Sequence, residues 1–223
     1  PPRAAGVAWR VLMVAAAAGC GSSGAVPASG ANAAHPAPAQ TAAASAHGDS
    51  SAGAPVPPGY GSLRQEDVSV TVRLPLVLVR AIPLDESIIR LLSPDSYRAL
   101  RQLRDGKRDV IARASARLGV QRPSLWYLSY FGLQPDAAFS SRDVQIVSGG
   151  REFRPLELIP LTAGFGSERV GQREVQSAIY LFDQGIDPNQ PLTVTVQSVP
   201  GSSWSAVIPV IERERALVRT RVP

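Results

Sequence analysis

The chain has 223 residues and a formal net charge of +5, and Lys107 is the one lysine among its 23 basic residues. A single cysteine rules out an internal disulfide, so a folded domain must be held by its own core. Residues 62–223 contain no His and no Cys, which excludes Ser-His-Asp and Cys-His catalytic centres there and ordinary zinc, copper or iron sites. We therefore predict no catalytic residue of these kinds, no metal and no cofactor.

The first twenty residues have the parts of an export signal. Arg3 and Arg10 precede a short apolar run, residues 11–19, that ends at Cys20. The run is shorter than the roughly 20 apolar residues that a membrane span needs, and small residues come before the cysteine. A core helix that ends at a cysteine is the alternative, but the polar sequence that follows leaves such a helix no core to join.

The motif Ala17-Ala18-Gly19-Cys20 resembles the lipobox of bacterial lipoproteins. The resemblance implies cleavage between Gly19 and Cys20 and a diacylglycerol on the thiol of Cys20. It also implies an exported protein that is lipid-anchored to the cell envelope. The next residue is Gly21 rather than Asp, which implies the outer membrane, facing the periplasm, if the organism has two membranes.

The sequence divides into three expected segments: a signal peptide at 1–19, a tether at 20–61 and a folded domain at 62–223. The tether consists almost wholly of small and polar residues and shows no apolar period, which predicts disorder. His35 and His47 both lie in it, and two isolated imidazoles make a poor metal site.

The domain opens with a strand pattern. Residues 68–73 alternate apolar and polar side chains and continue as residues 76–79, which predicts one long strand in which Pro75 marks a bulge, an edge position or a break.

A helical insertion is expected near 85–118. Within it, Ser93 and Pro94 predict a second helix start, with Ser93 as the N-cap. Gly106 is expected to kink or divide this helix, and Gly119 to stop it.

Strand patterns return after the insertion. Residues 125–131 are apolar on both faces, which predicts a central strand that is covered on both sides. Ser148-Gly149-Gly150 predicts a tight turn between strands at 143–147 and 151–153. A further strand is expected at 156–161.

The last elements are a strand pair and a terminal segment. Residues 175–182 and 192–196 predict a second antiparallel pair, joined by the loop 183–191. The apolar spacing that follows predicts a helix from near Pro209, with the charged run at 212–215 as its solvated face; a strand is the alternative.

These elements predict an α+β fold, an antiparallel β-sandwich with a helical insertion and a C-terminal helix. The segment 126–196 resembles the immunoglobulin-like modules of bacterial envelope lipoproteins. The resemblance is carried by an aromatic strand, by residues 143–146 and 150–155, and by the strand end at 178–182. Such modules have no place for the helical insertion, which we expect to pack on the sheet or at its end.

Two loops are candidates for binding. Gly164-Phe165-Gly166 predicts a flexible binding loop with Phe165 as its anchor; the alternative is a connector whose phenylalanine fills the edge of the core. The loop 183–189 spaces oxygen donors as calcium loops do, but it lacks the Gly and Glu of an EF-hand, which favours a plain hairpin loop.

A basic surface is the third candidate. Arg101, Arg104 and Arg108 lie on the polar side of the expected helix, where they could contact anionic lipid. The alternative is a solvated face whose arginines pair with acidic residues such as Asp105 and Asp109.

We therefore expect a lipid-anchored envelope protein with a non-enzymatic binding or scaffolding role. Its expected partner is another envelope protein, a wall polymer or an anionic glycolipid, and not a nucleic acid. The alternative is a carboxylate-dependent hydrolase of envelope glycans, which needs two carboxyl groups about 5 to 9.5 Å apart.

Overall fold

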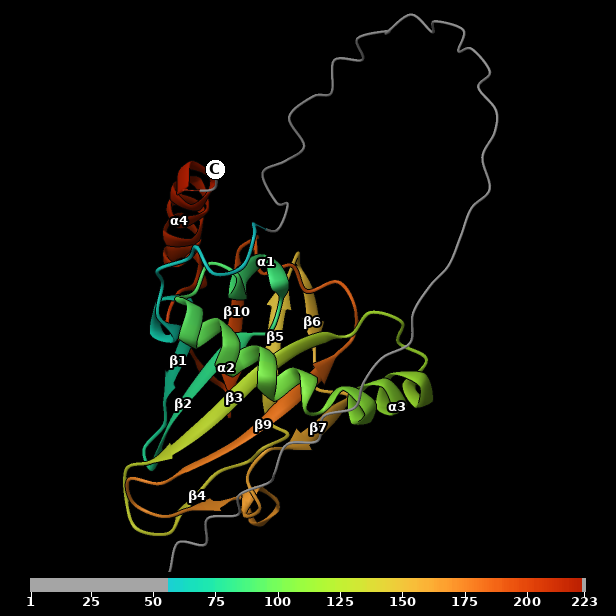
Figure 1. The fold of residues 1–223 in the computed structure, drawn as a ribbon. Helices are drawn as coiled ribbons and strands as arrows, with labels where there is room; N and C mark the ends of the chain where they lie inside the picture. Colours follow the sequence, from blue (N-terminus) through green and yellow to red (C-terminus); the bar gives the residue numbers. More distant parts are fainter. Residues whose placement is uncertain (1–55, 222–223) are drawn as a thin grey trace, which may run out of the picture. The chain divides into compact units, whose positions relative to one another are not determined.

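Residues 56–221 are described by the computed structural model, and they form an α+β fold (Figure 1). The strands are β1 (Val70–Arg73), β2 (Val77–Pro83), β3 (Ser124–Gly132), β4 (Ala137–Ala138), β5 (Val144–Ser148), β6 (Arg151–Phe153), β7 (Glu157–Pro160), β8 (Arg169–Val170), β9 (Val175–Phe182), β10 (Leu192–Val196) and β11 (Val199–Pro200). The α-helices are α1 (Glu86–Ile89), α2 (Pro94–Asp105), α3 (Arg108–Leu118) and α4 (Ile208–Arg221). The predicted α+β class is thus confirmed, whereas the signal, cleavage and lipidation predictions lie outside the described residues.

Five strands form one antiparallel sheet, in the order β1-β2-β3-β9-β7. The strand predicted at 125–131 is β3, and it is central as expected. Trp126, Leu128 and Tyr130 point to one face and are buried, whereas the residues between them are half-buried. The expectation that both faces are covered therefore holds fully for one face and partly for the other.

The long strand predicted at 68–79 is two strands instead. β1 and β2 pair antiparallel, with Val72 opposite Val79. Across the turn between them, the N–H of Leu74 donates to the carbonyl of Val77 at 3.0 Å. Pro75 lies in this turn, because a proline has no N–H to contribute to a ladder. Of the three interpretations of Pro75, the break is correct.

A second antiparallel sheet has the order β11-β10-β5-β6. It lies on one side of the five-stranded sheet, and α1 and α2 lie on the other (Figure 1). The predicted turn between β5 and β6 is confirmed: Gly149 and Gly150 have φ angles of 56° and 75°, which glycine adopts without strain.

The predicted pairing of 175–182 with 192–196 is wrong. β9 pairs with β3 and β7 in the larger sheet, and β10 pairs with β5 and β11 in the smaller one. The loop 183–191 therefore connects two sheets and is not a hairpin. The alternation of apolar and polar residues predicts which face of a sheet each side chain occupies, but it does not predict which strand lies next to it.

The helical insertion starts and stops where the sequence predicts. The carboxylate of Asp85 caps α1 by accepting the backbone N–H of Ser87 at 2.8 Å. α2 begins at Pro94, and Gly106 separates it from α3, so Gly106 divides the helical stretch. Gly119 ends α3 with a φ of 70°, the left-handed conformation that favours glycine.

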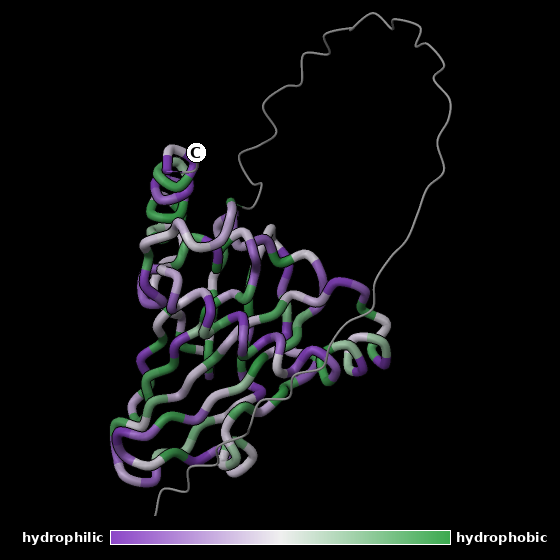
Figure 2. Tube along the Cα trace, in the orientation of Figure 1, coloured by the Kyte–Doolittle hydropathy of each residue, from purple (hydrophilic) through white to green (hydrophobic). Residues whose placement is uncertain are grey.

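One hydrophobic core joins both sheets and the helices, and hydrophobic segments run along the strands that enclose it (Figure 2). Two tyrosines form a hydrogen-bonded pair within it. The hydroxyl groups of Tyr130 and Tyr180 lie 2.8 Å apart, and that of Tyr180 donates to the carbonyl of Ser141 at 2.7 Å. Burial raises the pKa of both phenols, so both stay neutral and keep these hydrogen bonds.

The helix predicted near Pro209 is confirmed as α4, but its charged run is not wholly solvated as expected. Glu214 and Arg215 are 4% and 5% exposed. The carboxylate of Glu214 accepts hydrogen bonds from the backbone N–H and the hydroxyl of Ser62 at 2.8 and 2.9 Å. The guanidinium of Arg215 donates to the side-chain oxygen of Asn189 at 2.7 Å. Both charged groups can be buried because hydrogen bonds to other parts of the fold satisfy them, and these bonds connect α4 to the rest of the domain.

Candidate functional site

A groove of about 730 Å³ runs along α3. One wall is α3, and the other is the segment that leads from its end into β3. The lining residues are Arg104, Asp105, Arg108, Ile111, Ala112, Ser115, Ala116, Gly119, Val120, Gln121, Pro123 and Leu125. The charged members of this set stand at the α2–α3 junction, and the far end is apolar apart from Gln121.

Small side chains on one face of α3 leave room for the groove. Positions 108, 112, 115 and 119 follow each other at intervals of three or four residues, so they share a single helical face. Two of them are Ala112 and Ser115, whose side chains fill little space. Among the residues of α3, only Ile111 and Ala114 are buried in the core. The helix therefore rests on the body by a narrow contact and presents most of its surface outward.

Three arginines converge at the polar end of the groove. The carboxylate of Asp105 lies 3.3 Å from the guanidinium of Arg101, 3.3 Å from that of Arg108 and 3.7 Å from that of Arg104. Three guanidinium groups hold more N–H donors than one carboxylate can accept. The cluster thus keeps an excess of positive charge and of donors.

Glu86, on α1, extends the cluster toward the body. Its carboxylate pairs with Arg104 and with Arg90, in both cases at 2.6 Å. Burial alone would raise the pKa of Glu86, but the hydrogen bonds and charges of the two arginines hold it below its usual value. Glu86 is therefore an anion that fixes Arg104 at the edge of the groove.

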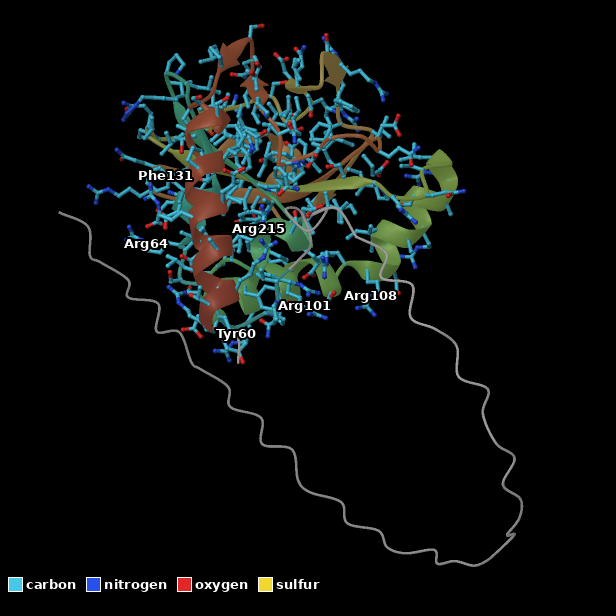
Figure 3. The ribbon with its side chains drawn as sticks, turned by 90° about the horizontal axis from the view of Figure 1, so that it is seen from above. Tyr60, Arg64, Arg101, Arg108, Phe131 and Arg215 are labelled. Carbon is cyan, nitrogen blue, oxygen red and sulfur yellow. The ribbon has the colours of Figure 1, made fainter. Side chains whose placement is uncertain are left out.

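The exposed arginines differ in how firmly they are held. The side chain of Arg104 is 23% exposed, whereas that of Arg108 is 73% exposed. Arg101 also bonds to the hydroxyl of Tyr97, and this bond raises the pKa of its guanidinium. Figure 3 shows Arg101, on α2, and Arg108, at the start of α3, along the same edge of the domain. Arg104 is thus a fixed cation, and Arg108 is one that can turn toward a ligand.

Charge is concentrated in this part of the chain. Residues 94–118 hold seven basic and three acidic side chains, a net +4, against +5 for the whole sequence. Arg101, Arg104 and Arg108 lie together around Asp105, which pairs with all three as the alternative interpretation expected. A contact of this basic surface with anionic lipid stays a prediction.

The loop at 164–166 does not present its aromatic side chain to solvent. Phe165 is 3% exposed, and its ring packs 5.7 Å from that of Phe139 and 6.1 Å from that of Tyr130, centroid to centroid. The expectation of Phe165 as a surface anchor is corrected on this point, because the aromatic ring gains more by joining the core. Gly164 and Gly166 flank a connector that closes the edge of the core.

The loop 183–189 uses its oxygens for its own geometry. The carboxylate of Asp187 accepts hydrogen bonds from the backbone N–H and the side-chain amide of Asn189, at 2.9 and 3.0 Å. Across residues 56–221, no group of three His, Cys, Asp or Glu side chains is placed to hold a metal ion.

Sequence reasoning missed the groove itself, because a groove depends on what lies opposite a helix. The one signal of a groove in the sequence was the spacing of small residues, Ala112, Ser115 and Ala116, among exposed arginines. It also missed Glu214 and Arg215, whose burial depends on Ser62 and Asn189, which are distant in the sequence.

No helix in the described part of the chain is long and apolar enough to cross a membrane. Comparisons with protein-family models, with curated proteins and with solved structures return no match for this chain.

Proposed function

We propose that this protein is a non-enzymatic binding module, held at a bacterial cell envelope by a lipid on Cys20. The observation that carries the binding role is the groove along α3. Its volume of about 730 Å³ lies within the roughly 300–1,000 Å³ of ligand sites, which combine an apolar lining with a few placed polar groups. The groove has this composition, with an apolar floor and Arg104 and Arg108 at one end.

The anchoring part of the proposal rests on the lipobox-like motif Ala17-Ala18-Gly19-Cys20. A domain attached in this way works close to a membrane. We include in the proposal an immunoglobulin-like sandwich as its scaffold, which two antiparallel sheets around one core support. In such scaffolds, function resides in elements added to the sheets, and the helical insertion is such an addition.

The ionisation of the acidic residues supports binding over glycan hydrolysis. A glycosidase needs one carboxyl group whose pKa is raised so that it can donate a proton. Around the groove the shifts have the opposite direction. Burial alone would raise the pKa of Asp105, but hydrogen bonds from Arg101 and Arg108 lower it, and the pKa of Glu86 is lowered as well. Both carboxylates thus stay ionised as counter-ions of arginine, and neither has the raised pKa of a proton donor.

The charge of the groove supports an anionic partner. The groove is lined by two cations and one anion, Arg104, Arg108 and Asp105, and residues 94–118 around it carry a net +4. This balance favours an acidic envelope protein, an anionic wall polymer or an anionic glycolipid over a neutral partner. An interaction of this kind weakens as salt concentration rises.

The anchor is tested by fractionating cells that express the natural chain or the Cys20→Ala variant. We expect the natural chain in the membrane fraction and the variant in the soluble fraction, because the variant has no thiol to carry lipid. A variant that stays with the membrane contradicts the anchor.

The binding role is tested by photo-crosslinking in intact cells. A photo-reactive residue replaces Ala112, which lines the groove, or Arg213, which is exposed on α4. We expect a reproducible adduct from position 112 that position 213 does not give. Equal labelling from both positions, or none from position 112, contradicts the groove as the binding site.

A further inference from the structure

The groove narrows the chemical class of its ligand. Arg104, Asp105 and Arg108 line one end of it, and the lining then follows α3 as far as Gly119. At about 1.5 Å per helical residue, the stretch from Arg108 to Gly119 spans about 16 Å. A ligand that matches this length has a charged end and an extended apolar part.

The floor of the groove offers few hydrogen bonds to a ligand. Ile111, Ala112, Ala116 and Leu125 present apolar side chains to it. The O–H of Ser115 already donates to the backbone carbonyl of Ile111 at 2.8 Å, so its oxygen can serve a ligand only as an acceptor. Apart from Gln121 at the far end, a peptide in this groove would find few side-chain partners for its backbone groups, and burying such groups without partners is costly. An acyl chain has no such groups.

The charged end of the groove fits an anionic headgroup. Arg101, Arg104 and Arg108 surround the carboxylate of Asp105, and Arg104 also pairs with Glu86. Three guanidinium groups hold more N–H donors than these two carboxylates take, so donors remain for a further anion. Arginine binds phosphate oxygens through paired N–H groups. The guanidinium of Arg104 is held in place by the carboxylate of Glu86 at 2.6 Å, so one of the arginines is already positioned to meet a phosphate.

We propose that the groove binds one acyl chain of an anionic phospholipid, with the phosphate against Arg104 and Arg108. This inference rests on the proposed function, in that it names the ligand class of the same groove. The apolar chain lies along the floor, against Ala112 and Ala116. The headgroup lies at the α2–α3 junction, where the positive charge is concentrated.

The experiment uses the full chain with Cys20→Ala, so that no lipid of its own competes. Its probe is lysophosphatidylglycerol below its micelle concentration, and binding is measured by titration calorimetry. Lysophosphatidylcholine supplies the same chain with a neutral headgroup, and glycerol 3-phosphate supplies the phosphate without a chain. We expect the first probe to bind tightest and glycerol 3-phosphate to bind weakest. Equal binding of glycerol 3-phosphate and the lysolipid overturns the proposal, since the acyl chain would then contribute nothing.

Paired variants locate the lipid in the groove. Ala112→Phe fills the groove, and we expect it to weaken binding of lysophosphatidylglycerol about tenfold or more, which corresponds to at least about 1.4 kcal/mol. Val110→Phe adds the same ring to an exposed position of α3 that does not line the groove, and it should bind as the parent does. Equal losses in both variants overturn the proposal.

A second pair tests the headgroup. Arg108→Gln should weaken binding of lysophosphatidylglycerol several-fold and leave lysophosphatidylcholine unchanged. Arg113→Gln, which removes the same charge from the same helix outside the groove lining, should change neither.

Circular dichroism and sedimentation of each variant accompany the titrations. If Ala112→Phe instead turns a dimer into a monomer, the occupant is a second copy of the chain and the lipid proposal is wrong. That result, or an absence of lysolipid binding beside a specific crosslink from position 112, would leave the proposed binding role intact.

Discussion

Helices α3 and α4 have similar charge patterns and opposite relations to the rest of the molecule. Arginine recurs along both, and each also holds acidic side chains: Asp109 in α3, and Glu212 and Glu214 in α4. α4 buries two of its charged side chains, Glu214 and Arg215. α3 buries only Ile111 and Ala114, and its arginines stay at the surface. The charged side chains of an arginine-rich helix can thus be buried in the fold or left at its surface, and the residues packed against the helix decide which.

α4 fastens three segments that are far apart in sequence. Glu214 holds Ser62, and Arg221 also reaches this carboxylate at 3.0 Å. Arg215 holds Asn189 in the loop before β10, and it donates to the carbonyl of Ser87 in α1 at 3.3 Å. Figure 3 shows Arg215, on α4, apart from Arg101 and Arg108. The buried charges of α4 therefore stabilise the fold, whereas those near α3 shape a groove.

The largest effect on stability is expected from Glu214→Ala. The change leaves the N–H and hydroxyl of Ser62 without their acceptor and the guanidinium of Arg221 without a counter-ion. We expect the free energy of unfolding to fall by about 2–3 kcal/mol, as for other buried hydrogen-bonded charges. Urea unfolding followed by tryptophan fluorescence measures it.

Glu212→Ala is the matched control, because Glu212 is exposed on the same helix. It should change the free energy of unfolding by less than about 0.5 kcal/mol. Equal losses in the two variants would remove the contrast that we draw within α4.

Arg215→Met should have the next largest effect. Methionine keeps most of the side-chain volume but leaves the carbonyl of Ser87 and the side-chain oxygen of Asn189 without this donor. We expect a loss of about 1–2 kcal/mol in the free energy of unfolding. Arg213→Met, at an exposed position, should be close to neutral. A stability gain in Arg215→Met would show that Arg215 does not fasten α4.

Glu86 links the pH dependence of stability to the groove. Its pKa is held below the usual value in the folded protein, so its contribution is fully present above about pH 4.5 and is lost as pH falls through the lowered pKa. Glu86→Gln should therefore be less stable at neutral pH and show a shallower loss of stability between neutral and acidic pH. Thermal unfolding over that range is the measurement, and identical slopes for variant and parent would contradict the role of Glu86.

The smallest effect on stability is expected at the rim of the groove. Arg108→Gln removes an exposed partner of Asp105 at 3.3 Å, and such pairs contribute less than about 1 kcal/mol. We expect the free energy of unfolding to change by less than about 0.5 kcal/mol. A larger loss would place Arg108 with the structural charges of α4 and not with the groove.

Local signals in the sequence predicted much of the fold. The helix end at Gly119, which has a positive φ, and the turn at Gly149-Gly150 depend on neighbouring residues alone, so the sequence was enough to predict them. The break at Pro75 was among the predicted alternatives for the same reason.

Features that depend on distant residues could not be predicted. The separation of β9 and β10 into two sheets depends on β3 and β5 as partners. The burial of Glu214 depends on Ser62, which precedes it by 152 residues. For the candidate site, the arginines were visible as a basic cluster. The groove was not, because Leu125, which lies across from α3, follows that helix by a connection whose path the sequence does not reveal.

Hydrogen–deuterium exchange of the full chain tests the central claim most directly. The measurement compares the natural protein in membranes purified from cells with the same protein extracted and separated from lipids and partners. We predict that residues 108–118 of α3 exchange more slowly in the membranes, because an occupant of the groove stabilises the helix against local opening. α4, which is already fastened by Glu214 and Arg215, should exchange equally in both states. Unchanged exchange in α3, or an equal change in α4, would contradict the account.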